Sequence, residues 1–251
     1  ELVNSYNSYV EKFNSTNQNE IDAGSINAMQ YSSVEFIEKA SGIKSRYVID
    51  KEGILDINRM MPRVKNEQQD RLSIHAEVGL KASERAMKQA NIKASKIDAV
   101  IVGTSHAARN YPAVAIEIQN ELGINGYAYD MLVGCSSTTF AINNAFSDIA
   151  SGLADTILVI NPEISTPAVN FTHRDKHFIF GDGCAASIIQ KNSNSDRSFK
   201  ILDRKLFTQF SNNISSDYSY LNRAAIDHKT NEDLLINKTD DSDTHLTLRQ
   251  T

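Results

Sequence analysis

The sequence is poor in cysteine, carries little net charge and contains no long apolar run. Two cysteines among 251 residues are too few for a disulfide framework, so we expect a reducing compartment such as the cytoplasm. A formal net charge of −5 does not indicate nucleic-acid binding. No run approaches the roughly 20 apolar residues of a membrane span, and we expect no secretory leader. Cysteines and histidines are not spaced as zinc ligands, so we expect no metal site.

What the sequence does contain is an alternation of apolar runs and amphipathic stretches. The runs lack a polar face, which is typical of strands that are buried on both sides. Because helical stretches separate them, they predict an α/β fold whose mainly parallel sheet is covered by helices on both faces. We expect strands at residues 99–102, 128–133, 156–160 and 185–190, and helices at residues 73–90, 113–122 and 138–151.

Cys135 lies between an apolar run and an amphipathic stretch. Residues 127–133 are predicted as a strand, the polar residues 134–137 end it, and an apolar helical face follows. The positive end of a helix dipole favours a thiolate, which is the nucleophilic form of cysteine. The alternative is a small buried apolar residue, because most free cysteines are buried. Position alone leaves both interpretations open.

Five short motifs occur in an order that resembles one enzyme family. They are the loop Ser41-Gly-Ile-Lys-Ser-Arg46, the pair Tyr111-Pro112 before a helix, Cys135, the run Phe180-Gly-Asp-Gly183 and the segment Thr244-His-Leu-Thr-Leu248. Together they resemble the β-ketoacyl-acyl-carrier-protein synthase III family of the thiolase superfamily, over nearly the whole chain. Each motif is weak by itself, and the shared order makes the resemblance specific.

The resemblance implies a thiolase-like fold, in which each half holds a mainly parallel five-stranded sheet with helices on both faces. Residues 1–191 would form the N-terminal half, and residues 192–251 would lead toward a C-terminal half outside this chain. Four strands of the first sheet are recognisable. We expect the family's first strand to precede residue 1 and to occupy the middle of the sheet, so that its absence would leave backbone groups unpaired.

The resemblance also implies a condensing acyltransferase of fatty acid synthesis that uses no cofactor, with a coenzyme A thioester as its substrate. Cys135 would take the acyl group from acyl-coenzyme A, and malonyl-acyl-carrier-protein would then lose CO2 and attack the thioester. The product would be a 3-oxoacyl chain on the carrier protein. The family supplies a histidine and an asparagine for this step from its second half. None of the six histidines here has the expected motif: His75, His106, His173, His177, His228 and His245.

Three side chains match substrate positions of the family, and each has a structural alternative. Phe36 would contact the adenine of coenzyme A, or else anchor its helix in the core. Arg174 would line the coenzyme A tunnel, or else pair with Asp175 or solvent. Tyr111 would border the acyl pocket and the dimer interface, or else act as a hydrophobic staple. The implied partners are acyl-coenzyme A, malonyl-acyl-carrier-protein and a second copy of the chain, paired through the edge strand at residues 127–130.

Two further segments carry expectations. Gly181 and Gly183 predict a tight turn that shapes the floor beneath the cysteine, and Cys184 is expected to be inert. The excursion at residues 44–72 carries apolar residues that would either cap an entrance for a longer acyl chain or pin the excursion to the protein surface. These residues are Ile54, Leu55, Ile57, Met60 and Met61.

The sequence leaves other functions open. Another thiolase-superfamily enzyme, such as a hydroxymethylglutaryl-CoA synthase or a ketosynthase of secondary metabolism, would use the same cysteine. A cysteine hydrolase is disfavoured because Ser137 breaks the Gly-x-Cys-x-Gly pattern. A non-catalytic scaffold with a packed cysteine is the remaining alternative.

Overall fold

The computed structural model describes residues 1–64, 71–192, 198–211, 214–216 and 246–248. These residues form two compact units. The first, the helical unit, consists of Glu1–Arg63 and Ser165–Gly181, together with the described residues after position 207. The second, the sheet unit, consists of the described residues within Val64–Ile164 and Asp182–Phe207.

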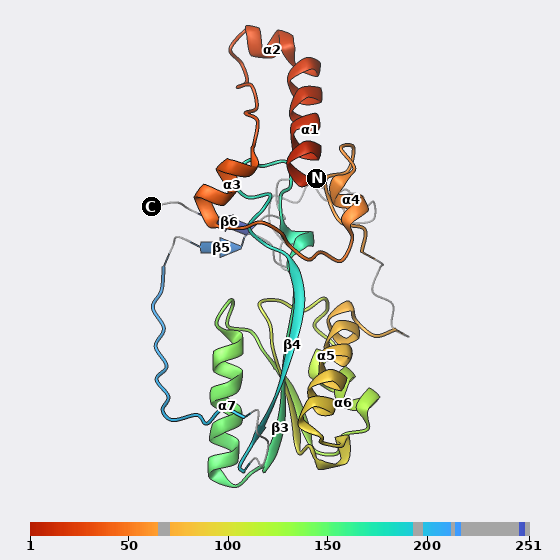
Figure 1. Cartoon of the computed structure of the whole chain (residues 1–251), viewed down its shortest axis with the longest axis vertical. Coiled ribbons are helices and arrows are strands. Elements are labelled where there is room, and N and C mark those ends of the chain that lie inside the picture. The colour runs from red at the N-terminus through yellow and green to blue at the C-terminus, as the bar shows by residue number, and fades with distance from the viewer. Residues whose placement is uncertain (65–70, 193–197, 212–213, 217–245, 249–251) are drawn as a thin grey trace, which may run out of the picture. The chain divides into compact units, whose positions relative to one another are not determined.

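The sheet unit is built on a four-stranded sheet in the order β2-β1-β3-β4 (Figure 1). β1 runs parallel to both β2 and β3, whereas β4 runs antiparallel to β3. The sheet is therefore mainly parallel, as predicted. Its strands are β1 (Ala99–Gly103), β2 (Tyr127–Met131), β3 (Thr156–Ile164) and β4 (Asp182–Gln190).

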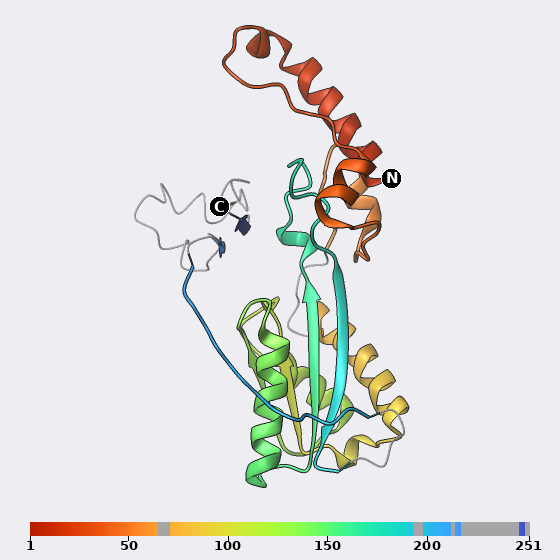
Figure 2. The same cartoon turned by 60° about the vertical axis from the view of Figure 1, so that its left-hand side comes forward.

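Helices cover both faces of this sheet, as Figure 2 shows. Two of them, α5 (Ile74–Ala90) and α6 (Val114–Leu122), lie on one face, and α7 (Ser137–Ser151) lies on the other. Successive side chains of a strand point to opposite faces. Val100 and Val102 of β1 therefore pack against α5 and α6, whereas Ala99 and Ile101 pack against α7. Burial of both faces explains why these runs lack polar positions.

The predicted strands and helices are confirmed, with shifts at their ends. The largest shifts are in β3, which ends at Ile164 rather than at residue 160, and in β4, which begins at Asp182 rather than at residue 185. Both strands are longer than predicted because they pair with each other along their whole length. This antiparallel pairing runs from Thr156↔Gln190 to Ile164↔Asp182.

The described sheet does not leave the unpaired backbone groups that we expected from a missing middle strand. β1 pairs directly with β3, from Ala99↔Ile157 to Val102↔Ile160, and it pairs with β2 on its other side. The ladder groups on both edges of β1 are therefore hydrogen-bonded. A first strand before residue 1, which the resemblance implies, stays a prediction.

The helical unit packs short helices around a small apolar core. Tyr6 and Val10 are 1% and 0% exposed and meet Phe171 in this core. His177 stacks on Tyr6, with ring centroids 4.6 Å apart. The helices of this unit are α1 (Leu2–Thr16), α2 (Gln18–Asp22), α3 (Val34–Ser41), α4 (Lys51–Leu55) and the short η2 (Thr166–Ala168). The same unit includes the antiparallel strands β5 (Ile214–Ser216) and β6 (Leu246–Leu248), whereas the short helix η1 (Ala94–Lys96) belongs to the sheet unit.

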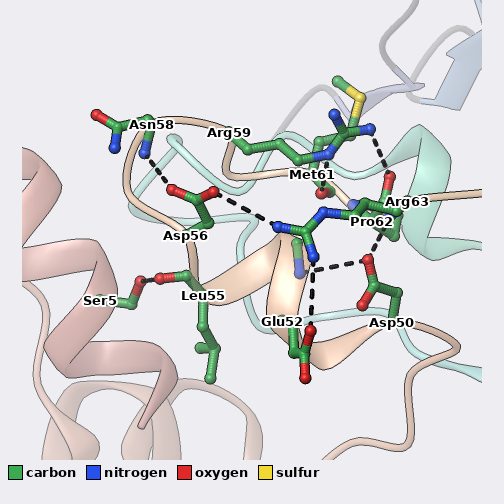
Figure 3. Close-up of polar contacts among 11 residues, drawn as sticks. Ser5, Asp50, Glu52, Leu55, Asp56, Asn58, Arg59, Met61, Pro62 and Arg63 are labelled. Atoms are coloured by element: carbon green, nitrogen blue, oxygen red, sulfur yellow. Dashed lines mark hydrogen bonds and ion pairs between the residues drawn. The ribbon is translucent and has the colours of Figure 1, made fainter.

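Asp50 and Arg63 organise the excursion that contains α4 (Figure 3). The Asp50 carboxylate accepts a hydrogen bond from Gly53 N, which caps α4, and another from Arg63 N at 2.6 Å. The Arg63 guanidinium lies 3.5 Å from Glu52 and 3.6 Å from Asp56. These contacts close the segment on itself.

The apolar residues of this excursion hold it to the helical unit. Ile54 and Met60 are 3% and 4% exposed, and both belong to the core that contains Tyr6. They therefore pin the excursion, as the structural alternative predicted. Ile54 and Leu55 also line a cavity of about 380 Å³ within the same unit.

Candidate active site

Cys135 lies in the connection between the end of β2 at Met131 and the start of α7 at Ser137, as predicted. Gly134 before it has a left-handed backbone with a φ of 54°, a conformation that favours glycine. The cysteine is exposed, so it is not a packed core residue. The 15-residue helix α7 begins two residues later, and its dipole favours negative charge at this point. This position suits a nucleophile.

Hydrogen bonds join the chain segments at the ends of β1, β2 and β3. Thr104, directly after β1, is fully buried; its hydroxyl donates to Pro162 O at 2.6 Å, and its amide donates to Met131 O at 3.1 Å. Ser105 donates from its amide and from its hydroxyl to Glu163 Oε1. These contacts hold Thr104 and Ser105 to β3 and to the end of β2. We call these hydrogen-bonded strand ends the frame, and the connection that carries Cys135 begins at it.

His75 and His106 pack against each other in the sheet unit. The rings meet edge to face at 5.6 Å, and His106 Nε2 lies 2.8 Å from Ile164 O. Burial, followed by the neighbouring charge of His106, lowers the pKa of His75 to about 4. His75 is therefore neutral near pH 7, which fits a structural role. His228 and His245 lie outside the described residues.

Asp130 on β2 holds the start of α6. Its two carboxylate oxygens accept hydrogen bonds from Val114 N and Ala115 N, at 2.8 Å each. These bonds satisfy amides that have no partner within α6. Burial raises the pKa of Asp130, although the two amide hydrogen bonds act in the opposite direction.

Tyr111, just before α6, is 87% exposed, so it does not act as a hydrophobic staple.

In the helical unit, the structure brings Phe36 and Arg174 together. The Arg174 guanidinium lies over the Phe36 ring, 3.8 Å from its centroid. Arg174 Nε donates to Tyr31 O at 2.8 Å, and Nη1 lies 3.5 Å from Asp175. Ile37, 7% exposed, anchors α3 in the core, whereas Phe36 is only partly buried. Two residues that the resemblance assigns to the coenzyme A site thus form one stacked pair.

Gly181 and Gly183 do not form the expected tight turn. Neither has a left-handed φ, and β4 already begins at the residue between them. Gly181 is needed for a different reason, since a side chain there would lie 2.7 Å from Tyr47 O. Arg46, next to Tyr47, also binds the segment before Gly181. Its Nε and Nη2 donate to Ile179 O, at 3.0 and 2.9 Å.

The second cysteine has a different environment. Cys184 lies in β4, and burial raises the pKa of its thiol to about 12. It is therefore protonated near pH 7, which agrees with the inert role expected for it.

Across the described ranges, no three or more His, Cys, Asp or Glu side chains are grouped to hold a metal ion. The same part of the chain contains no helix with the length and apolarity of a membrane crossing.

Sequence reasoning missed the residues that hold this frame. Thr104 directly follows β1, and Asp130 and Glu163 are each the residue before the last of β2 and β3. A polar residue at that point of an otherwise apolar run was the available signal. Their partners lie far along the chain, such as Pro162 for Thr104, and no local pattern indicates them.

Comparison with known proteins gives a consistent result. A family model described as 3-oxoacyl-[acyl-carrier-protein (ACP)] synthase III matches residues 129–209, which include Cys135 and Arg174. A β-ketodecanoyl-[acyl-carrier-protein] synthase from Pseudomonas aeruginosa is 47% identical over 224 residues, covering 88% of this chain and 64% of that protein. A β-ketoacyl-[acyl-carrier-protein] synthase III from Paracoccus denitrificans is 35% identical over 133 residues, covering 51% of this chain and 41% of that protein.

A solved structure shares the fold. The β-ketoacyl-[acyl-carrier-protein] synthase III from Thermus thermophilus is 26% identical and has a TM-score of 0.52, covering 65% of this chain and 44% of that protein. The chain spans less than two thirds of the length of these relatives. In the family model, the relatives and the thiolase-like fold alike, the chain is similar to the β-ketoacyl-acyl-carrier-protein synthase III family.

Proposed function

We propose that the intact protein is a condensing acyltransferase of fatty acid synthesis that carries its acyl group on Cys135. The observation that supports this most is the exposed cysteine at the start of α7, within the segment that the synthase III model matches. In this proposal, residues 1–191 belong to the N-terminal half of the thiolase-like fold. Residues 192–251 connect it to a C-terminal half.

The first half-reaction loads the enzyme. The Cys135 thiolate attacks the thioester carbonyl of acyl-coenzyme A, and a new carbon–sulfur bond to Cys135 forms. The carbon–sulfur bond to coenzyme A breaks, and the departing thiolate takes a proton from solvent. The tetrahedral oxyanion between these events needs N–H donors, and the Cys135 amide is a candidate for one of them.

The second half-reaction forms the carbon–carbon bond. Malonyl-acyl-carrier-protein loses CO2, and the electron pair left on carbon attacks the Cys135 thioester. The bond to Cys135 breaks, the thiolate returns, and a 3-oxoacyl chain two carbons longer remains on the carrier protein. The donors for the enolate oxygen are the histidine and asparagine expected from the C-terminal half. No cofactor takes part in this scheme.

We propose that octanoyl-coenzyme A is the preferred primer. The relative from Pseudomonas aeruginosa is named for a β-ketodecanoyl product, and it is 47% identical over 88% of this chain. Condensation adds two carbons, so a ten-carbon product requires an eight-carbon primer. The buried Met60 contributes to this preference only by shaping the helical unit, since it is a core residue.

Mass spectrometry of the full-length protein tests this function. Octanoyl-coenzyme A is expected to add one octanoyl group, located on Cys135 by peptide mapping. Malonyl-acyl-carrier-protein should then discharge the group and yield 3-oxodecanoyl-acyl-carrier-protein. A protein that stays unmodified with acyl-coenzyme A donors of every length tried would contradict the function. A strong preference for acetyl-coenzyme A would contradict the primer length alone.

We propose that the pair of Phe36 and Arg174 contacts the nucleotide end of coenzyme A. A planar ring beneath a planar guanidinium suits adenine stacking, and the positive charge suits the phosphates. Arg174→Ala is expected to raise the KM for octanoyl-coenzyme A by about tenfold or more, because charge-assisted contacts are lost. The KM for octanoyl-pantetheine, which lacks the nucleotide, should stay unchanged.

Arg204 provides a matched control for this prediction. Its guanidinium also stacks on a phenylalanine, 4.1 Å from the Phe146 ring centroid, but in the sheet unit. Arg204→Ala should leave both KM values unchanged. If Arg174→Ala raised the KM for both substrates equally, the nucleotide contact would be refuted.

We also propose that two copies of the protein pair through β2. This strand lies at an edge of the described sheet, as predicted, and β1 is its partner there. Pairing with a second copy would cover the remaining backbone edge, which otherwise invites aggregation. Sedimentation that finds only monomers at micromolar concentration would contradict this. A reducing compartment such as the cytoplasm completes the proposal, since Cys135 and Cys184 are both free thiols.

A further inference from the structure

Ser137 is the first residue of α7 and lies two positions after Cys135. It is 1% exposed, although serine is an ordinary surface residue and Ser136 before it is exposed. A buried hydroxyl requires hydrogen-bond partners. Those partners show what this side chain does.

The Ser137 hydroxyl ties the cysteine connection to the frame at the end of β1. Its oxygen accepts a hydrogen bond from Val133 N at 2.8 Å. Its proton has two carbonyl acceptors within reach, Thr104 O at 2.9 Å and Gly134 O at 2.7 Å. One side chain therefore holds two residues that precede the cysteine and one residue of the loop after β1.

The backbone of Ser137 is held as well. A side chain on Gly103, the last residue of β1, would lie 2.7 Å from the Ser137 carbonyl oxygen. The start of α7 thus packs directly on the end of β1. Cys135 lies inside a five-residue connection, from Val133 to Ser137, whose two ends meet at one hydroxyl.

We propose that Ser137 is a positioning residue that fixes the cysteine against the N-terminus of α7 and thereby sets its reactivity as a thiolate. The inference rests on the proposed role of Cys135 as the nucleophile. The favourable field of a helix falls off within its first turn, so a small displacement of the sulfur changes the stabilisation of the thiolate. Without the hydroxyl, Val133 N loses its acceptor, and Thr104 O and Gly134 O lose their donor. The connection then shifts so that these groups find other hydrogen-bond partners.

Ser136 is a matched control, because it is a neighbouring serine in the same connection. It is the N-cap of α7, and its side chain makes no capping hydrogen bond. Removing its hydroxyl therefore leaves the contacts of Ser137 in place. Ser136→Ala and Ser137→Ala delete the same atom at adjacent positions and differ in the bonds they remove.

The experiment measures the rate of iodoacetamide alkylation at Cys135 in the full-length protein, from about pH 5 to about pH 9. For Ser137→Ala, we expect an alkylation rate about tenfold lower near neutral pH, because the thiolate loses its fixed place at the start of α7. Ser136→Ala should follow the wild type. A purely structural role would lower the melting temperature and leave the pH profile of the folded protein unchanged, and that result would overturn the inference.

A second variant keeps the test informative if Ser137→Ala does not fold. Gly103→Ala retains the hydroxyl but places a Cβ 2.7 Å from Ser137 O and 2.9 Å from Asn161 Nδ2. It should lower the alkylation rate in the same way, and an unchanged profile would overturn the inference. Octanoyl loading separates the two proposals. If the wild type takes up an octanoyl group and both variants share its alkylation profile, only the role of Ser137 is refuted. A wild type that neither loads nor shows a reactive Cys135 refutes the proposed function as well.

Discussion

Replacing Cys135 by alanine is expected to abolish octanoyl loading and to reduce condensation to the background rate. The substitution removes the only atom that forms the thioester in the proposed reaction, so both half-reactions lose their nucleophile. The fold should survive, because Cys135 is exposed. Intact mass after incubation with octanoyl-coenzyme A, together with the rate of 3-oxodecanoyl-acyl-carrier-protein formation, measures the effect.

Cys184→Ala is the control for this substitution. Burial in β4 keeps the Cys184 thiol protonated, with a pKa of about 12, so it is not a nucleophile near pH 7. The Cys184 variant should load and condense at the wild-type rate. If the Cys135 variant still loaded an octanoyl group, the nucleophile would have to lie elsewhere.

Replacing Glu117 by alanine is expected to destabilise the sheet unit by about 3–5 kcal/mol. The residue is 6% exposed, and its carboxylate accepts hydrogen bonds from Ser73 N at 2.9 Å and from Ser73 Oγ at 2.7 Å. It also forms an ion pair with Arg109, whose side chain is 17% exposed. The carboxylate on α6 thus joins the start of α5 to the loop after β1. Its loss removes the carboxylate that faces this nearly buried guanidinium.

Denaturant unfolding of single and double variants checks this prediction. Glu121→Ala is the control, because Glu121 is exposed on the same helix and should change the free energy of unfolding by less than about 0.5 kcal/mol. Combining Glu117→Ala with Arg109→Met should recover much of the loss, since the buried positive charge is then removed too. Equal losses in the Glu117 and Glu121 variants would show that the buried ion pair contributes nothing.

The sequence by itself determined the elements of the sheet unit and the place of the cysteine. An apolar run without a polar face specifies a strand buried on both sides, as β1 is, and helical periodicity specifies the amphipathic helices that cover it. Cys135 was placed between β2 and α7 for the same local reason. These properties depend on residues that are neighbours in the chain, so a single sequence carries them.

Only the tertiary structure decided which distant groups meet. The direct pairing of β1 with β3 was not predicted, because period-two patterning specifies the face of a strand and not its neighbour. Arg174 reaches Tyr31 across 143 positions and covers Phe36, and Ser137 reaches Thr104 across 33. Such contacts follow from how the loops close and from which buried polar groups need partners. No local pattern encodes them, and they are the contacts that position the proposed site.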